Sequence, residues 1–280
     1  MAALVSGKIT QLSPLVRRLL APNAGPFTGP GTNTYIVGKS ELAVIDPGPE
    51  IAAHVDTLLD ELTGRIRWIL VTHTHRDHSP AATLLKERLG SDVEVIGMPC
   101  DIEGASFDQG FSPDRLFEHH HSIKTNEFTL TAIHTPGHAS NHLCYFLEEE
   151  ALLFSGDHLM DGTTVVIAPP DGDMSHYMQS LSLLFDYPIA TIAPAHGNLI
   201  TDAHEEVEKT IKHRLNRESK VVAALLSCPG QSIADLTPLV YDDVPPFMHP
   251  IAQQSLRAHL LKLVDDGQAS DEQGQWMLTK

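Results

Sequence analysis

The sequence predicts an α/β fold, in which two mixed sheets pack on each other with helices outside, followed by a small helical unit. Short β-branched runs alternate with helical stretches through residues 1–200, and strands outnumber helices there. Many strands with few helices favour sheets packed face to face. After Gly197 the pattern changes to an amphipathic helical stripe. With 280 residues, the chain is long enough for a large domain with an appended unit.

The strands of the first part follow from β-branched runs bounded by Gly, Pro, Asp or Asn. We expect a first strand at residues 15–20, a pair at 32–38 and 42–48, a helix at 51–62 and a buried strand at 66–72. Further strands are expected at residues 92–97, 127–135, 143–147, 151–157 and 189–197.

The last part of the chain is predicted to be mainly helical. Residues 204–226 carry apolar side chains at helical spacing, which predicts a connecting helix. Two shorter helices are expected at 232–241 and 251–267, and residues 272–280 can form a hairpin wing. We therefore divide the chain into residues 1–200, 201–230 and 231–280.

Composition excludes several classes of protein. No apolar run approaches the roughly 20 residues that span a bilayer, so no membrane partner is expected. The three cysteines lack C-x-x-C spacing, which is typical of a reducing compartment. Charged and polar residues interrupt the apolar N-terminal stretch, which argues against a secretory signal. A cytoplasmic location is expected, or the mitochondrial matrix for a eukaryotic source.

Residues 71–85 hold the highest concentration of candidate metal ligands in the sequence. In an extended chain His73 and His75 share one face, so both can bind one ion, and Asp77 and His78 follow after a turn. Ser79 is expected to cap a helix that has Pro80 in its first turn. The segment thus predicts two pairs of metal ligands on a strand-to-helix corner.

Three further ligands are expected at the ends of other strands. His138, Asp157 and His196 each follow an apolar strand and lie beside a Gly or Pro that allows a sharp turn. A carboxylate at Asp157 can bridge two ions. Other histidines are expected to be core or supporting groups (His134, His142 and His158) or a solvated loop (119–121).

These residues resemble the metallo-β-lactamase superfamily, whose H-x-H-x-D-H signature matches His73 to His78. The resemblance implies an αββα sandwich. It also implies a first metal on His73, His75 and His138, a second on Asp77, His78 and His196, and Asp157 shared. It further implies that Asp46 supports the metal loop. Imidazoles and carboxylates without thiolates favour two zinc ions, with iron or manganese as alternatives.

Two ions would acidify a shared water, giving a hydroxide nucleophile that attacks a carbonyl or phosphoryl centre. Asp77 is expected to be catalytic, orienting this nucleophile and passing on its proton.

Segments 29–38, 153–166 and 212–225 resemble the lactamase-β-2-like subfamily. That resemblance implies a winged-helix-like C-terminal unit, and either single-strand endoribonuclease activity or hydrolysis of carrier-bound thioesters. It also implies a cleft edge at Asn33 and Thr34. Substrate contacts are expected there and at Thr163, Thr164 and Tyr177, although turn formation explains the loop residues equally well.

Charge separates the candidate functions. The net charge of -17 repels polyanions, and residues 231–280 hold three basic against seven acidic side chains. We therefore favour a small-molecule ester, thioester or lactone over RNA, which stays the alternative because the metals attract a phosphodiester. A metal-stabilised DNA-binding regulator is disfavoured, because structural zinc sites are closed and usually rich in Cys. The C-terminal unit is expected to pack over the metal cleft.

Overall fold

A computed structural model describes residues 4–62 and 64–279, so the expected outer limits at residues 1 and 280 lie outside the described residues. Its first sheet has seven strands in chain order. The N-terminal strands pair antiparallel up to β4, and the later ones pair parallel; helices join β4 to β5 and β5 to β6, and an irregular segment joins β6 to β7. The strands are β1 (Thr10–Gln11), β2 (Val16–Leu20), β3 (Asn33–Val37), β4 (Leu42–Ile45), β5 (Ile66–Leu70), β6 (Glu94–Gly97) and β7 (Arg115–Leu116).

The second sheet has five strands in the order β12-β11-β10-β9-β8. Neighbours from β8 to β11 pair antiparallel, whereas β11 and β12 pair parallel. Both sheets are therefore mixed. The strands are β8 (Ser122–Lys124), β9 (Thr129–His134), β10 (Leu143–Leu147), β11 (Leu152–Gly156) and β12 (Thr191–Pro194).

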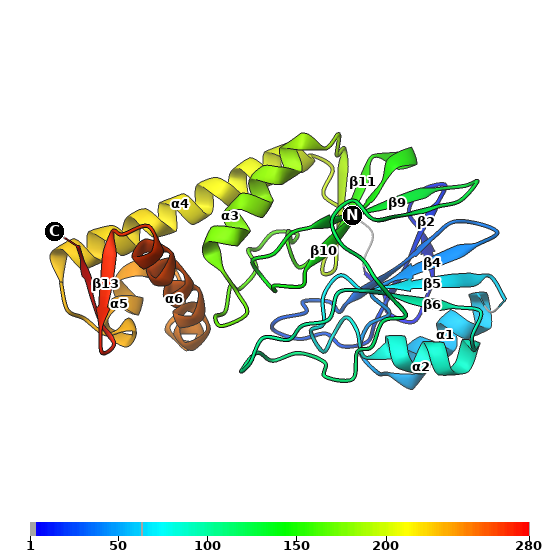
Figure 1. The fold of residues 1–280 in the computed structure, drawn as a ribbon, viewed down its shortest axis with the longest axis horizontal. Coiled ribbons are helices and arrows are strands. Elements are labelled where there is room, and N and C mark those ends of the chain that lie inside the picture. Colours follow the sequence, from blue (N-terminus) through cyan, green and yellow to red (C-terminus); the bar gives the residue numbers. More distant parts are fainter. Residues whose placement is uncertain (1–3, 63, 280) are drawn as a thin grey trace.

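The two sheets pack face to face, and helices cover their outer faces (Figure 1). The layer between the sheets includes Tyr35, Ile45, Leu70, Tyr145 and Phe154, all buried. Helices α1 (Ala52–Leu62) and α2 (Ala81–Leu89) pack on the outer face of the first sheet. Helix α3 (Met174–Leu183) and the start of α4 (Ala203–Ser227) pack on the second. The expected αββα sandwich is confirmed.

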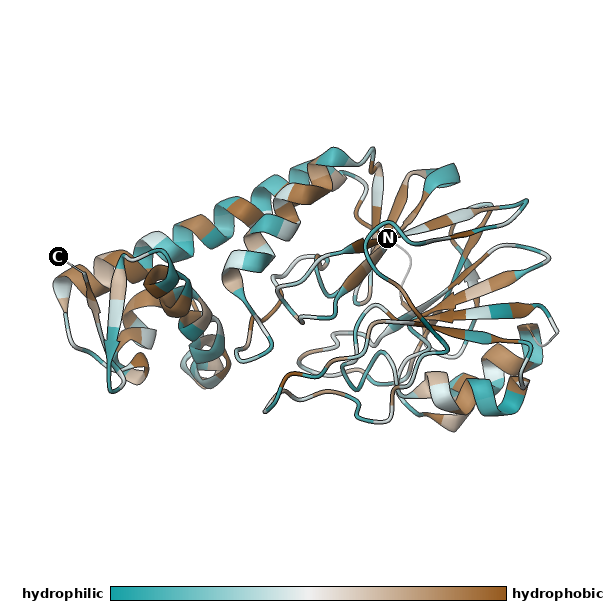
Figure 2. Ribbon diagram, in the orientation of Figure 1, coloured by the Kyte–Doolittle hydropathy of each residue, from teal (hydrophilic) through white to brown (hydrophobic). Residues whose placement is uncertain are grey.

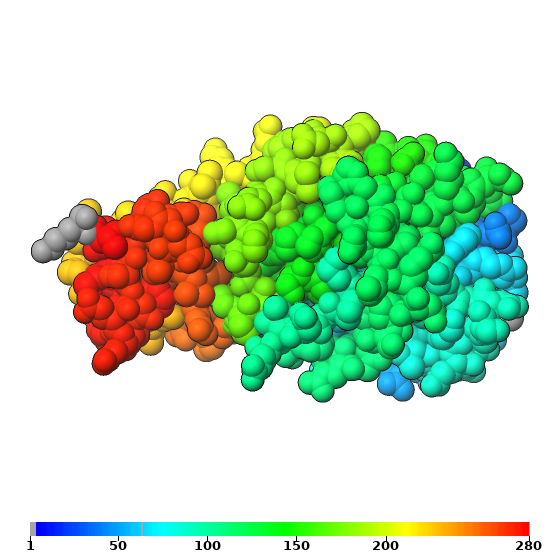
Figure 3. All heavy atoms as spheres, viewed as in Figure 1, coloured from blue at the N-terminus to red at the C-terminus, as the bar shows by residue number. Residues whose placement is uncertain are grey.

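Helix α4 continues beyond the sandwich and becomes part of a second core at one end of the molecule (Figures 1 and 3). There its apolar face meets α5 (Ile233–Val240), α6 (His249–Asp265) and the hairpin β13 (Ala269–Glu272) and β14 (Gln275–Leu278). The alternation of polar and apolar residues along α4 is visible in Figure 2. Helices with a hairpin wing match the predicted C-terminal unit.

One local prediction is wrong. Ser79 does not cap α2, because its hydroxyl donates to Asp108 at 2.8 Å and the helix begins at Ala81 with no side-chain cap. The Ala81 N–H donates instead to the Gly48 carbonyl, and the Gly48 N–H donates to the His78 carbonyl. The corner is thus fixed by the loop after β4. No helix in the described part of the chain is long and apolar enough to cross a membrane.

Candidate metal centre

The segment after β5 carries the local histidine cluster. The backbone is held on both sides, because Leu143 donates to the Thr72 carbonyl and the Tyr145 hydroxyl donates to the Val71 carbonyl. The chain then turns, with the His78 N–H donating to the His75 carbonyl. This turn brings side chains from an extended segment and from a corner to the same edge of the sandwich.

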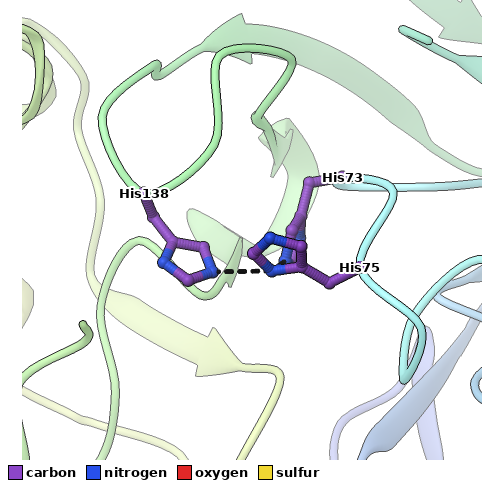
Figure 4. Close-up of side chains that lie close together, drawn as sticks. All are labelled: His73, His75 and His138. Carbon is purple, nitrogen blue, oxygen red and sulfur yellow. Dashed lines mark hydrogen bonds between the residues drawn. The ribbon is translucent and has the colours of Figure 1, made fainter. Parts of the chain in front are cut away.

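Three imidazoles form the first group of donors (Figure 4). His73 Nε2 lies 2.9 Å from His75 Nδ1, and His138 Nε2 lies 3.0 Å from the same atom. His138 arrives from the loop after β9, as the sequence predicts. A tetrahedral zinc ion with Zn–N bonds of about 2.0–2.1 Å holds its ligand atoms about 3.3 Å apart. The spacing of the three nitrogens therefore fits one metal ion.

A second group of donors lies beside the first. Asp77 Oδ2 is 3.4 Å from His78 Nε2 and 3.2 Å from His196 Nε2. Asp157, at the end of β11, lies between the two groups, with Oδ2 3.6 Å from both His138 Nε2 and His78 Nε2. Its Oδ1 is 3.4 Å from His196 Nε2. The structure thus brings all seven predicted ligands together, with Asp157 in the shared position.

The far nitrogens of these imidazoles are held by hydrogen bonds that fix the tautomer. Nδ1 of His138 donates to the Val166 carbonyl at 2.8 Å, and Nδ1 of His196 donates to the Gly31 carbonyl at 3.1 Å. Nδ1 of His78 lies 3.0 Å from Asp46 Oδ2. In each case the neutral ring carries its proton on Nδ1 and offers the Nε2 lone pair to a cation.

Asp46 supports two histidines at once. Its carboxylate accepts from the Thr72 N–H at 2.7 Å and from the Thr72 hydroxyl at 2.8 Å, as well as facing His78. The Thr72 oxygen in turn lies 3.1 Å from His73 Nδ1. Asp46 therefore orients His78 directly and His73 through Thr72. It is buried and has a φ of 49°, which Asp tolerates better than most residues.

Burial and neighbouring charges set the protonation of the cluster. Burial, together with the neighbouring imidazoles, lowers the pKa of His73 well below its ordinary value and that of His75 to about 4. Burial disfavours the ionised form of Asp77, yet His78 and His196 hold its pKa well below the usual range. Burial likewise opposes a charged His78, but Asp77, Asp157 and Asp46 raise its pKa well above 6.5. Without a metal, a proton on His78 balances these carboxylates.

Several ligand atoms of the cluster are buried without a hydrogen-bond partner in the described part of the chain. His78 Nε2, His196 Nε2 and Asp157 Oδ1 are buried and have no hydrogen-bond partner among the described residues. Buried polar atoms are nearly always satisfied, and each orphan costs about 1–3 kcal/mol. The five imidazoles and two carboxylates face each other with no ammonium or guanidinium among them. This donor set fits two divalent cations.

A cleft of about 490 Å³ opens over the donors. His75, Asp77, His138 and Asp157 lie at its base, and its walls are mostly apolar. Met248 and Ile251 bring the C-terminal unit to one wall, so this unit shapes the cleft as expected. No Lys or Arg lines the cleft within the described ranges. The other walls include Pro26, Phe27, Met160, Thr163, Thr164, Val165, Val166, Ala168, Pro169 and Pro170.

The structure separates the five residues that were expected to contact substrate. Thr163 and Thr164 line the cleft. Asn33 is buried away from it, and its amide donates to the carbonyls of Pro194 and Gly197 at 2.9 Å. Thr34 is also buried and donates to the Asp46 carbonyl, and the buried Tyr177 donates to the His158 carbonyl. The geometry argues against substrate contact for these last three residues.

The other histidines lie behind or outside the cluster. His142 is buried and its Nε2 accepts from the Asp157 N–H at 3.2 Å, so it supports the shared carboxylate. His134 binds the Ser140 carbonyl at 2.9 Å, and His158 is buried against Tyr177. Histidines 119–121 are exposed and belong to none of the metal-type groups found among the described residues.

Sequence reasoning missed most of the cleft wall. Phe27, Met160, Met248 and Ile251 carry no catalytic group, so their residue types give no signal of a substrate wall. Ile251 lies in the first turn of α6 and Met248 directly precedes this helix, where apolar residues are equally typical of helix packing. An exposed Phe27, with 63% of its surface accessible in a Gly- and Pro-rich loop, is the one weak signal.

The fold and this cluster define a class of protein: a hydrolase built on an αββα sandwich with a metal-type donor cluster at the edge of its sheets. The sequence profile of the metallo-beta-lactamase superfamily matches residues 27–196, and that of the beta-lactamase associated winged helix domain matches residues 232–276. The chain belongs to the metallo-beta-lactamase superfamily.

Its similarity to known proteins extends through both parts. "Beta-lactamase-like protein 2 homolog" of Caenorhabditis elegans is 31% identical over 92% of this chain and 87% of its own length. "Atrochrysone carboxyl ACP thioesterase nsrC" of Aspergillus novofumigatus is 32% identical, over 78% of this chain and 65% of its own length. A beta-lactamase domain protein of Burkholderia ambifaria superposes with a TM-score of 0.81 at 18% identity, covering 99% of this chain and 95% of that one. This last match shows the fold alone.

Proposed function

We propose that the chain is a dinuclear metal-dependent hydrolase that acts on a small-molecule ester, thioester or lactone. The cluster of seven donors at the base of a mainly apolar cleft is the observation that supports this proposal most strongly. In this proposal His73, His75 and His138 hold one zinc ion, Asp77, His78 and His196 hold the other, and Asp157 is shared. Residues 1–200 form the catalytic unit, 201–230 the connecting helix and 231–280 the winged unit.

When bound, the two ions supply an acidified water and polarise the substrate oxygen. Asp77 is suited to orient that water and to pass on its proton, because it lines the cleft and its side chain is 27% exposed. Its Oδ2 faces His78 and His196, which leaves Oδ1 to accept a hydrogen bond from that water. The hydroxyls of Thr163 and Thr164 can orient a polar group of the substrate beside the centre.

The cleft supports an acyl substrate over a phosphodiester. Its walls bring apolar side chains close to the donors, and the described lining residues include no cation to pair with phosphates. Protein that binds nucleic acid backbones uses Lys and Arg for most of the affinity. The names of fungal relatives as carrier-protein thioesterases also support acyl chemistry.

A DNA-binding regulator is the least supported alternative. Helix α6 has two basic residues, and one of them, Lys262, is paired with Glu218 at 3.0 Å and Asp266 at 2.7 Å. A recognition helix needs free basic side chains on one face. The role supported for this helix is to shape the cleft through Ile251.

A parallel turnover panel tests the proposal. It includes a thioester, an ester, a lactone, a β-lactam, a phosphodiester and short single-stranded RNA, each with and without a chelator. We expect chelator-sensitive turnover of acyl substrates and its loss in Asp77→Ala. Turnover of RNA alone, or turnover that survives complete removal of metal, would contradict the proposal.

A further inference from the structure

The loop at residues 163–168 forms hydrogen bonds both to His138, one of the proposed metal ligands, and to the helices α4 and α6. Nδ1 of His138 donates to the Val166 carbonyl at 2.8 Å. The residues on either side of Val166 are held from two other helices: Arg214 of α4 donates to the Val165 carbonyl at 2.5 Å, and the Ile167 N–H donates to Ser255 of α6 at 3.2 Å. The carbonyl that fixes His138 is therefore flanked by two anchors.

Arg214 is unusual among the charged residues of the chain. It is 3% exposed, and no carboxylate of the described residues lies within ion-pair distance of its guanidinium. Its Nε has no hydrogen-bond partner there either. Burying an unpaired charge is costly, so the burial of Arg214 points to a role for the contacts that it makes. The neutral group that it binds, the Val165 carbonyl, belongs to the cleft wall.

The other contact of Arg214 leads to the same centre. Its Cζ lies 5.1 Å from the centroid of the Tyr177 ring. Tyr177 donates its hydroxyl to the His158 carbonyl at 2.8 Å, next to Asp157, and its backbone packs against Gly137, next to His138. A Cβ at Gly137 would lie 2.4 Å from Tyr177 Cα. Arg214 thus lies behind both the loop that orients His138 and the tyrosine that supports Asp157.

We propose that Arg214 is a positioning residue that holds His138 and Asp157 in ligand geometry, through the Val165–Val166 carbonyls and through Tyr177. The inference rests on the proposed metal site and gives the connecting helix a role in its assembly. Supporting partners of metal ligands commonly change metal affinity by about 10-fold to 100-fold. Loss of Arg214 should have an effect of this size without removing any ligand.

Arg217 provides a matched control on the same helix. It is also buried, at 6% exposed, and also donates to a backbone carbonyl, that of Val240, at 2.6 Å. Its remaining contacts are Asp243, at 2.7 and 3.0 Å, and the Tyr241 ring, all within the C-terminal unit. Removing Arg217 therefore perturbs a buried arginine of α4 without touching the loop over His138.

The test compares Arg214→Met, Arg214→Lys and Arg217→Met in the full chain. Zn²⁺ affinity is measured by competition with a chromophoric chelator, and the Co²⁺ absorption spectrum reports ligand geometry. We expect Arg214→Met to weaken zinc binding about tenfold or more and to change the Co²⁺ spectrum. We expect partial recovery in Arg214→Lys, which keeps one donor, and Arg217→Met to stay within about twofold of the parent.

Zinc binding by Arg214→Met within about twofold of the parent would overturn the inference, as would an equal loss in Arg217→Met. If Arg214→Met does not fold, Ser255→Ala takes its place, because it removes the second anchor of the same loop and should weaken zinc binding several-fold. An unchanged affinity in Ser255→Ala would then refute the role of the loop. A parent protein that binds no zinc would refute the proposed function itself, so the two failures are distinguishable.

Discussion

Replacing Asp46 by asparagine tests most sharply whether this residue orients His73 and His78, two of the proposed metal ligands. Asparagine is isosteric and also tolerates the φ of 49° at this position, so the backbone needs no adjustment. One oxygen can still accept from the Thr72 N–H, as Oδ1 does now at 2.7 Å. The new amide N–H₂, however, replaces the oxygen that lies 3.0 Å from His78 Nδ1 and 2.8 Å from the Thr72 hydroxyl. Two donors then face each other.

In the metal-free protein the raised pKa keeps both ring nitrogens of His78 protonated, so the ring can relieve this clash by losing the Nδ1 proton and keeping the one on Nε2. That tautomer directs an N–H instead of a lone pair at Asp77 and Asp157, so binding of the second metal must first reverse it. The cost is about that of one hydrogen bond to a charged group, roughly 1.5–3 kcal/mol. At about 1.4 kcal/mol for each factor of ten, zinc affinity should fall by about 10-fold to 100-fold.

The assay is chelator competition for Zn²⁺, with metal content determined after gel filtration. The matched control is Asp114→Asn, because Asp114 also accepts from a backbone N–H, that of Val95 at 2.7 Å, but has no contact with the cluster. We expect the control to bind zinc like the parent. Affinity within about twofold of the parent in Asp46→Asn, with both variants folded, would refute the role assigned to Asp46.

Three further predictions follow from the site and its walls. The pKa of His78 is raised well above 6.5 in the metal-free protein, so below that pKa zinc must displace a proton in order to bind. Apparent zinc affinity should therefore increase from pH 6 to pH 8, by up to about tenfold per pH unit. A fall in affinity over this range in zinc titrations would contradict the prediction. Gly137→Ala places a Cβ 2.4 Å from Tyr177 Cα, so it should lower the free energy of unfolding by about 2–3 kcal/mol in denaturant titrations of metal-free protein. A loss below about 1 kcal/mol would show that the backbone at residue 137 can shift to accommodate the methyl group. Ile251→Ala removes part of the cleft wall. In steady-state kinetics it should raise KM for long-chain thioesters up to about tenfold and leave KM for acetyl thioesters unchanged. Equal effects on KM for both chain lengths would refute an acyl subsite at Ile251.

The ligands were predictable because their signal is local. His73, His75, Asp77 and His78 lie within one short segment, and His138, Asp157 and His196 each follow an apolar strand. Strand ends of a packed sandwich meet at one edge, which is where the structure places them. The main strands were predictable for a similar reason, since buried β-branched runs have few other structures to adopt.

The supporting contacts were not predictable, because they join residues distant in sequence through backbone groups. Arg214 donates to the Val165 carbonyl, and Ser255 accepts from the Ile167 N–H. No pattern of side chains in the sequence predicts either hydrogen bond. The charged residues around Arg214 in the sequence are typical of a solvated helix face, so they give no sign that this side chain is buried. The Ser79 cap failed for a tertiary reason, since the Gly48 carbonyl takes the N–H at the start of α2.

The metal content of protein purified without added metal, measured together with turnover, tests whether the seven donors hold two metal ions that drive hydrolysis. We expect two zinc ions per chain, and chelation should remove both the metal and the hydrolysis of acyl substrates. His196→Ala should keep the three imidazoles of the first group and retain about one ion with little turnover. Protein that contains less than one ion per chain, or that hydrolyses its substrate equally well without metal, would rule out a dinuclear metal-dependent hydrolase.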